Sequence, residues 1–191
     1  MTDPSMRLPD VPYHAVYFYR TPDGLADTIS RFVADGLAIG QPAVVIARPH
    51  VRQRIEAGLS AMGVDAGTAT RLNRLMLVDA ATAVEAILVD DRPDLLRCGE
   101  LLDSFLERVG EGSGIGKVRF YGEMAGLLWH EGRRVAALEL EEFANQATAH
   151  PRCITVCGYS SPDMPERSAS DDICAFHTHV MSDTGQLDAT R

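Results

Sequence analysis

The sequence lacks the features that define several large classes of protein. It has no apolar run long enough to span a bilayer, and its first residues have no apolar segment of a secretory signal. It has no long block of Lys and Arg, and its formal net charge is −9, from 27 acidic and 18 basic residues. Such a chain is a poor candidate for binding nucleic acid or anionic membranes directly. We therefore expect a cytoplasmic protein that binds neither membrane nor nucleic acid.

The sequence also lacks common catalytic motifs, including G-x-S-x-G, H-E-x-x-H and G-x-G-x-x-G. A phosphate loop needs glycines, a Lys and a Ser or Thr, but the apolar run at 42–47 is followed by "ARPHVRQRI". Pro49 even removes one backbone N–H donor. We expect no ATP hydrolysis by a P-loop mechanism and no cofactor. Arg48, His50 and Arg52 either form an anion site at the start of a helix or are simply solvated there.

What the sequence does contain is a regular alternation of strand and helix patterns. The 191 residues, 46% of them hydrophobic, suit one domain over 11–181, with flexible tails at 1–10 and 182–191. Strands are predicted over 14–20, 42–47, 74–80, 117–123 and 152–160. Helices are predicted between them, and a last helix is predicted over 171–181. This alternation predicts a three-layer α/β fold, in which a mostly parallel sheet of about five or more strands has helices on both faces.

Ligands of open α/β sheets bind beyond the carboxyl ends of the strands, so polar residues there are candidates for a site. Glu123 lies where the fourth predicted strand meets a helix, and Tyr121 precedes it. The Glu123 carboxylate either binds a ligand or a cation or transfers a proton, or it stabilises the helix N-terminus. Glu141 and Asn145 are i,i+4 neighbours on a later helix, and they either face a ligand or form a solvated flank.

The four cysteines leave three interpretations open. Cys157 lies near the end of the fifth predicted strand, and Cys174 and His177 are i,i+3 neighbours in the last predicted helix. With His14 nearby, these residues can form a mixed thiolate–imidazole metal site, although their spacing matches no standard zinc pattern. Buried core cysteines and a redox-sensing thiol are the other two interpretations.

Several blocks of sequence, taken in order, resemble those of a known family. They are "HAVYFYRTPDGL", "FVADGLAIGQPAVVIA", "VRFYGEMAGLLW", "LELEEFAN", "VCGYS" and "ICAFHTHV". Together they cover about residues 13–181 and resemble the MEDS (methanogen/methylotroph, DcmR-type sensory) domain. The resemblance implies a RecA/KaiC-like scaffold without a Walker A phosphate loop, and a domain that senses small molecules, notably hydrocarbon derivatives.

The resemblance also supplies candidate residues. The motif residues carried over by position are His14, Arg119, Gly122, Glu123, Glu141, Asn145, Cys157 and His177. Tyr121 and Tyr159 are added as aromatic groups of a pocket. Family members are often joined to a DNA-binding domain or a histidine kinase, and this sequence contains neither.

The leading hypothesis is therefore a stand-alone sensory domain. It would bind a small molecule, such as a hydrocarbon derivative or a C1-type compound, and regulate a partner histidine kinase or transcription regulator, with homo-oligomerisation as one route for the signal. The alternatives are a partner-switching regulator without a small ligand, and a nucleotide- or metal-binding protein.

Overall fold

The computed structural model describes residues 13–110, 116–148, 153–164 and 167–190. A seven-stranded sheet lies at its centre, with the strand order β3-β2-β6-β7-β1-β8-β9. The strands are β1 (Tyr13–Tyr19), β2 (Ala43–Ala47), β3 (Leu75–Asp79), β6 (Val118–Gly122), β7 (Cys153–Ser160), β8 (His179–Met181) and β9 (Leu187–Ala189). Neighbouring strands are parallel throughout, except that β8 and β9 are antiparallel.

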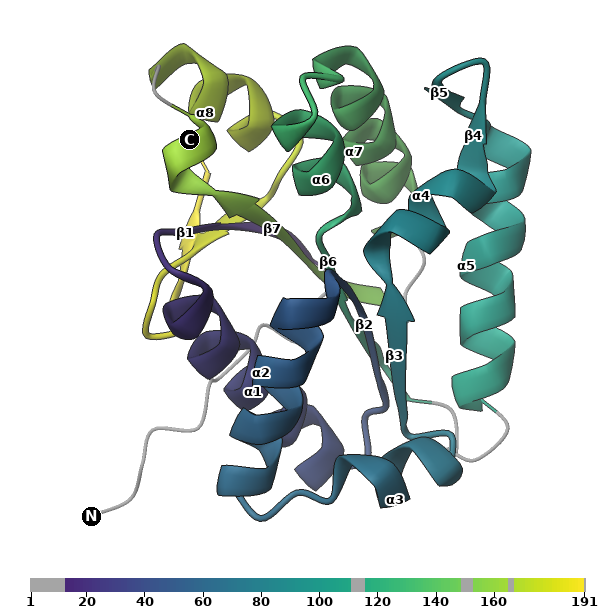
Figure 1. Ribbon diagram of the computed structural model, residues 1–191, viewed down its shortest axis with the longest axis vertical. Coiled ribbons are helices and arrows are strands. Elements are labelled where there is room, and N and C mark those ends of the chain that lie inside the picture. Colours follow the sequence, from purple (N-terminus) through teal and green to yellow (C-terminus); the bar gives the residue numbers. More distant parts are fainter. Residues whose placement is uncertain (1–12, 111–115, 149–152, 165–166, 191) are drawn as a thin grey trace.

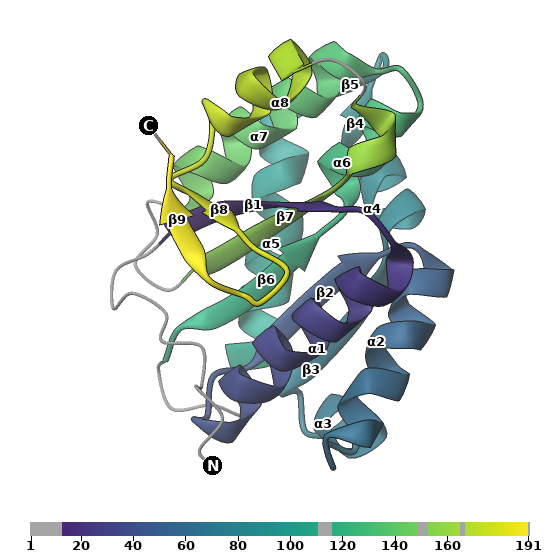
Figure 2. The same cartoon turned by 90° about the vertical axis from the view of Figure 1, so that its left-hand side faces the viewer.

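Helices cover both faces of this sheet, as Figures 1 and 2 show. On one face lie α1 (Pro22–Ala38), α2 (Pro49–Ala61) and the short α3 (Ala66–Arg71). On the other lie α4 (Ala80–Ile87), α5 (Leu95–Gly110), α6 (Met124–His130), α7 (Arg134–Thr148) and α8 (Arg167–Cys174). A 3-10 turn spans Ser161–Asp163, and a small hairpin joins β4 (Leu88–Val89) to β5 (Arg92–Pro93). The predicted three-layer α/β architecture is confirmed.

The alternation of side chains along the strands decides which residues reach each helical layer. In β1, Tyr13, Ala15 and Tyr17 pack in the core under α1 and α2. Because successive side chains point to opposite faces, His14 and Val16 face α7 and α8 instead. Both sets are buried, so the strand shows no alternation of polar and apolar residues.

Local signals in the sequence place two of the helices. Thr21 caps α1, since its hydroxyl accepts a hydrogen bond from the Gly24 N–H at 3.2 Å, and Pro22 begins the helix. Helix α6 packs directly on β7, because a Cβ at Gly126 would lie 2.2 Å from the carbonyl oxygen of Gly158. Only glycine at position 126 permits this close approach.

The C-terminal region differs from the prediction. The helix predicted over 171–181 ends at Cys174, and 179–181 form β8, which pairs with β1. The edge of β1 thus pairs with a three-residue segment around the β-branched Val180 that the local pattern alone assigned to a helix. Residues 187–189, in the predicted tail, pair with β8, whereas the tail predicted at 1–10 lies outside the described residues.

The loop at 90–91 interrupts the helical region between β3 and β6. It is the turn of the β4–β5 hairpin, where Asp90 and Asp91 have φ of 48° and 66°. Two consecutive residues with positive φ are typical of a type I′ turn, which Asp tolerates better than most residues. Across the described ranges, no helix combines the length and the apolar character that crossing a membrane requires.

Candidate functional site

Four side chains with metal-binding chemistry meet between the sheet and helices α7 and α8. His14 comes from β1, Glu141 from α7, Cys157 from β7 and His177 from the turn after α8. We call these residues the buried quartet, because all four side chains are buried. One donor atom from each lies within 4.8 Å of all the others.

The sheet itself brings two members of the quartet together. β1 and β7 are parallel neighbours, and His14 pairs with Thr155, two residues before Cys157. Side chains two residues apart on a strand share a face, so His14 and Cys157 both point toward α7. Glu141 then enters from that helix.

Short contacts join the four donor atoms. The Oε2 of Glu141 lies 3.2 Å from the Nε2 of His14 and 3.3 Å from the Nε2 of His177. The Nε2 of His14 also lies 3.2 Å from the Sγ of Cys157. The two imidazole rings pack against each other, with centroids 4.0 Å apart. Two ring nitrogens, a carboxylate oxygen and a sulfur therefore converge on one point.

Backbone carbonyls hold both imidazoles in this orientation. The Nδ1 of His14 lies 3.1 Å from the carbonyl oxygen of Phe176, and the Nδ1 of His177 lies 2.7 Å from that of Ile173. A carbonyl oxygen only accepts hydrogen bonds, so each Nδ1 carries a proton and donates it. In the neutral ring, each Nε2 then presents a lone pair to Glu141.

Glu141 is held as a carboxylate inside the protein. The hydroxyl of Tyr159 donates to its Oε1 at 2.6 Å. Burial raises the pKa of Glu141, but the imidazoles of His177 and His14, when they carry a second proton, lower it by more and hold it well below its usual value. Burial and the Glu141 carboxylate raise the pKa values of Cys157 and Tyr159 well above their usual ranges. Without a cation, the quartet thus combines a carboxylate with a thiol.

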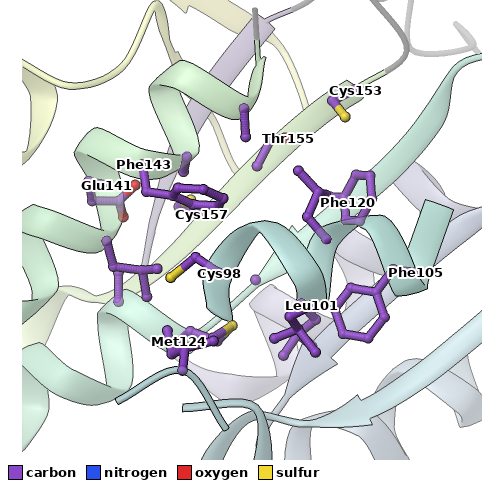
Figure 3. Close-up of a pocket in the computed structure, with 18 of the residues that line it drawn as sticks. Cys98, Leu101, Phe105, Phe120, Met124, Glu141, Phe143, Cys153, Thr155 and Cys157 are labelled. Carbon is purple, nitrogen blue, oxygen red and sulfur yellow. The ribbon is translucent and has the colours of Figure 1, made fainter. Parts of the chain in front are cut away.

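A cavity of about 120 Å³ adjoins the quartet between the sheet and helices α5, α6 and α7. Figure 3 shows Glu141 and Cys157 on one side of it, and Phe105 and Phe120 on the other. The remaining wall is almost entirely apolar and includes Ile46, Ile87, Leu101, Leu102, Met124, Leu140 and Phe143. The cavity therefore offers an apolar volume with one polar end, as small-molecule sites commonly do.

A second polar cluster lies where β2 and β6 end. Glu123 is 1% exposed, and its Oε2 accepts the backbone N–H of Arg48 at 2.9 Å, at the N-terminus of α2. Its Oε1 accepts from the Arg48 guanidinium at 2.9 Å and from the Tyr19 hydroxyl at 3.1 Å. Arg48 also contacts the Tyr19 hydroxyl. A side-chain carboxylate thus occupies the place where a helix N-terminus attracts an anion.

The whole arrangement falls within the range of one family model. Residues 13–179 match the model described as the MEthanogen/methylotroph, DcmR Sensory domain, abbreviated MEDS. The protein belongs to the MEDS family. The match includes all four residues of the quartet, and membership supports a sensory or signal-transduction role.

Comparison with solved structures bears on the scaffold of this MEDS domain. It is similar to a KaiC-like protein from the hyperthermophilic archaeon Pyrococcus horikoshii OT3, with a TM-score of 0.59. The two are 12% identical over 89% of this chain and 71% of the other. At this identity the likeness concerns the fold, and it confirms the predicted RecA/KaiC-like scaffold. No curated protein sequence matches the chain.

The MEDS structure brings together some of the residues predicted to bind a ligand. Tyr121 and Glu141 both line the cavity, and Tyr159 is hydrogen-bonded to Glu141. His14 reaches Glu141 from the far side of the quartet and does not line the cavity. Glu123 is paired with Arg48 and does not line the cavity, although its neighbours Gly122 and Met124 do.

The structure does not bring Arg119 or Asn145 to this site. Arg119 is 3% exposed under α1, where its guanidinium donates to the Phe32 carbonyl and, at 2.9 Å, to Gln41 Oε1. It also lies 5.1 Å from the centroid of the Phe32 ring. These contacts make Arg119 part of the core between α1 and the sheet. Asn145 is exposed on α7 and does not line the cavity.

The predicted anion site at the start of α2 is divided among ion pairs. Arg48 is paired with Glu123, and the Nη2 of Arg52 lies 3.1 Å from Asp79 Oδ2. His50 is exposed. Two of the three predicted positive groups are therefore matched by carboxylates of the same domain.

The predicted metal residues are divided as well. Cys157 and His177 belong to the quartet, but Cys174 does not. The i,i+3 relation between Cys174 and His177 assumed a continuous helix, whereas α8 ends at Cys174 and a turn carries His177 toward β1. The sequence indicated His14 both as a ligand contact and as a neighbour in a mixed metal site, but it indicated Glu141 only as a ligand contact. Their joint presence with Cys157 and His177 in the family motif was the available signal.

Proposed function

We propose that this MEDS protein is a sensory domain that binds one small apolar molecule in the cavity between α5 and α7. The ligand class is a hydrocarbon derivative or a C1-type compound. The domain regulates a partner histidine kinase or transcription regulator, and it does not hydrolyse ATP. Family membership supports the sensory role, and the apolar cavity with Glu141 and Cys157 at one side supports the ligand class.

The size of the cavity restricts the ligand. An apolar cavity of about 150 Å³ in another protein binds benzene, so a cavity of about 120 Å³ favours molecules of that size or smaller. The aromatic and aliphatic wall provides dispersion contacts but almost no hydrogen-bonding groups, which disfavours sugars, nucleotides and amino acids. Short haloalkanes and other small hydrocarbon derivatives meet both restrictions.

Helix α5 offers a route from the cavity to a partner. Cys98 and Leu101 line the cavity from this helix, while Leu95 and Leu96 in its first turn are 60% and 79% exposed. A ligand changes the signal only if it binds two states of the domain with different affinity. A shift of α5 on binding would move its exposed leucines. We therefore propose α5 as the surface that a partner contacts.

The surroundings of Glu123 support the absence of ATP hydrolysis. Its carboxylate already accepts the N–H and the guanidinium of Arg48, so a phosphate at the N-terminus of α2 would meet a negative charge at close range. The sequence there also lacks the Lys and the Ser or Thr that a phosphate loop uses.

A thermal-shift screen with a cavity-filling variant tests the proposal. Short haloalkanes, C1 compounds and hydrocarbons up to the size of benzene are compared with ATP on the wild-type protein. Ala144→Leu places a larger side chain in the cavity wall, and Ala57→Leu makes the same change at an exposed position of α2. We expect at least one apolar compound to raise the Tm of the wild type and of Ala57→Leu, but not that of Ala144→Leu.

Two results would contradict the proposal. If no compound shifts the Tm and a kinase or regulator co-purifies with the protein, a partner-switching module without a small ligand is favoured, and the exposed Leu95 and Leu96 fit such a role. ATP turnover that is abolished by Glu123→Gln would overturn the non-enzymatic assignment.

A further inference from the structure

We propose that the buried quartet of His14, Glu141, Cys157 and His177 binds a divalent transition-metal ion of the zinc class. The proposal does not depend on the cavity ligand. It rests on four observations: atoms without hydrogen-bond partners, the spacing of the donor atoms, the second shell around them, and the chemical type of the donors.

Two buried polar atoms without hydrogen-bond partners meet at the centre of the quartet. Within the described residues, neither Glu141 Oε2 nor His177 Nε2 has a hydrogen-bond partner, although the two lie only 3.3 Å apart. Because His177 donates its Nδ1 proton to the carbonyl of Ile173, its neutral ring presents a lone pair to the carboxylate lone pairs. Buried polar groups without partners are costly, and a cation between these atoms turns the repulsion into attraction.

The distances among the donors suit tetrahedral coordination. With metal–ligand distances of about 2.0–2.3 Å for N, O and S, neighbouring ligand atoms of a tetrahedron lie about 3.3–3.8 Å apart. The Nε2 of His14 lies 3.2 Å from both Glu141 Oε2 and Cys157 Sγ, and His177 Nε2 lies 3.3 Å from Glu141 Oε2. No pair in the set exceeds 4.8 Å. Only small side-chain adjustments are needed to enclose an ion.

The second shell is that of a metal site. Histidines that bind metals usually donate their other N–H to a carbonyl or carboxylate, and ligating carboxylates are themselves hydrogen-bonded. Here the Nδ1 atoms of His14 and His177 donate to two backbone carbonyls, those of Phe176 and Ile173. The Tyr159 hydroxyl donates to the outer oxygen of Glu141. All three contacts direct the inner donor atoms toward the same point.

The donor set selects the kind of ion. A thiolate and two imidazoles are soft or borderline ligands that Mg²⁺ and Ca²⁺ avoid, because those ions prefer oxygen ligands in larger numbers. Zn²⁺ takes four ligands of the N, O and S types in a closed tetrahedral site. Binding requires the Cys157 thiol to release its proton to solvent, so one proton leaves for each ion bound.

The same residues offer one competing explanation. If an imidazole of His14 or His177 carries a second proton, its Nε2–H forms an ion pair with Glu141, and no metal is needed. Both explanations depend on the Glu141 carboxylate, but only the metal site depends on the Cys157 sulfur. The discriminating residue is therefore Cys157.

The experiment measures metal content and sulfur coordination on the whole chain. Protein purified without chelator is analysed for bound metals, then stripped and titrated with Zn²⁺ and with Co²⁺ as a spectroscopic probe. We expect about one metal ion per chain, intense visible bands of tetrahedral Co²⁺, and a thiolate-to-cobalt charge-transfer band. At a hundredfold excess over its Kd, Zn²⁺ should raise the Tm by about 5–10 °C.

Matched thiol variants assign the ligand. Cys157→Ser should lose the charge-transfer band, whereas Cys174→Ser, which changes a thiol outside the quartet, should keep it. Circular dichroism monitors the folding of both variants. If Cys157→Ser does not fold, the charge-transfer band and the Zn²⁺-dependent Tm of the wild type still decide the matter. Stripped wild-type protein whose Tm and spectrum do not respond to Zn²⁺ or Co²⁺ would overturn the proposal in favour of the ion pair.

Discussion

The carboxylate of Glu123 offers the sharpest test of how the start of α2 is stabilised. Glu123→Ala removes an acceptor that is 1% exposed and leaves the Tyr19 hydroxyl and two donors of Arg48 without it. Breaking a buried ion pair costs about 3–5 kcal/mol. The Arg48 side chain is 24% exposed, so part of its charge regains water. We expect a loss of about 2–4 kcal/mol, or a fall in Tm of roughly 4–16 °C for a chain of this size.

The same variant should create an anion site that the wild type does not offer. With Glu123 removed, the Arg48 guanidinium and the N-terminus of α2 are left without a negative partner. Inorganic phosphate at ten times its Kd should then restore about 1.4 kcal/mol, measured by thermal unfolding against chloride at matched ionic strength. Wild-type protein and a Glu123→Ala/Arg48→Met double variant are the controls, since phosphate also stabilises proteins through exclusion from their surfaces.

Two outcomes would refute this reasoning. A Glu123→Ala protein as stable as the wild type would mean that the carboxylate does not stabilise the start of α2. Equal stabilisation of wild type and variant by phosphate would mean that the phosphate effect does not arise at the position that Glu123 holds.

Two further predictions concern packing around the candidate site. Gly126→Ala places a Cβ 2.2 Å from the backbone carbonyl oxygen of Gly158, which cannot move aside, so we expect a loss of about 3 kcal/mol or more in urea unfolding. Gly99→Ala is the control, because a Cβ there has nothing within 4 Å and should be neutral or stabilising. Tyr159→Phe removes the donor to Glu141 Oε1, and we expect a loss of about 1.5–3 kcal/mol in the same assay; an unchanged midpoint would mean that this contact contributes nothing.

The sequence predicted the layers of the fold better than its edges. The runs at 42–47 and 117–123 form interior strands of the sheet, because a segment with apolar residues on both faces is best buried between two layers of helices. Strand β8, His179–Met181, was missed because three residues carry almost no periodic signal, and its pairing with β1 is a long-range contact.

The candidate site shows the same division between local and long-range information. A helical wheel left the role of Glu141 open, and spacing paired His177 with Cys174. Both conclusions treated each element separately. The quartet exists because the register of β1 on β7 brings His14 beside Cys157, while α7 and the turn after α8 pack over them. None of these relations is visible within a single segment, and only the family motif connected the four residues in advance.

Because the two proposed sites share residues, their ligands must influence each other. Glu141 and Cys157 belong to the quartet and also line the cavity. An ion held by both side chains would fix their positions and place a positive charge at the polar side of an apolar volume. A molecule with a halogen or oxygen atom should then bind the metal-loaded protein more tightly than the stripped protein, and by linkage it should tighten Zn²⁺ binding by the same factor. Titrating each ligand with and without the other measures that factor, and a value of one in both directions would show that the sites act independently.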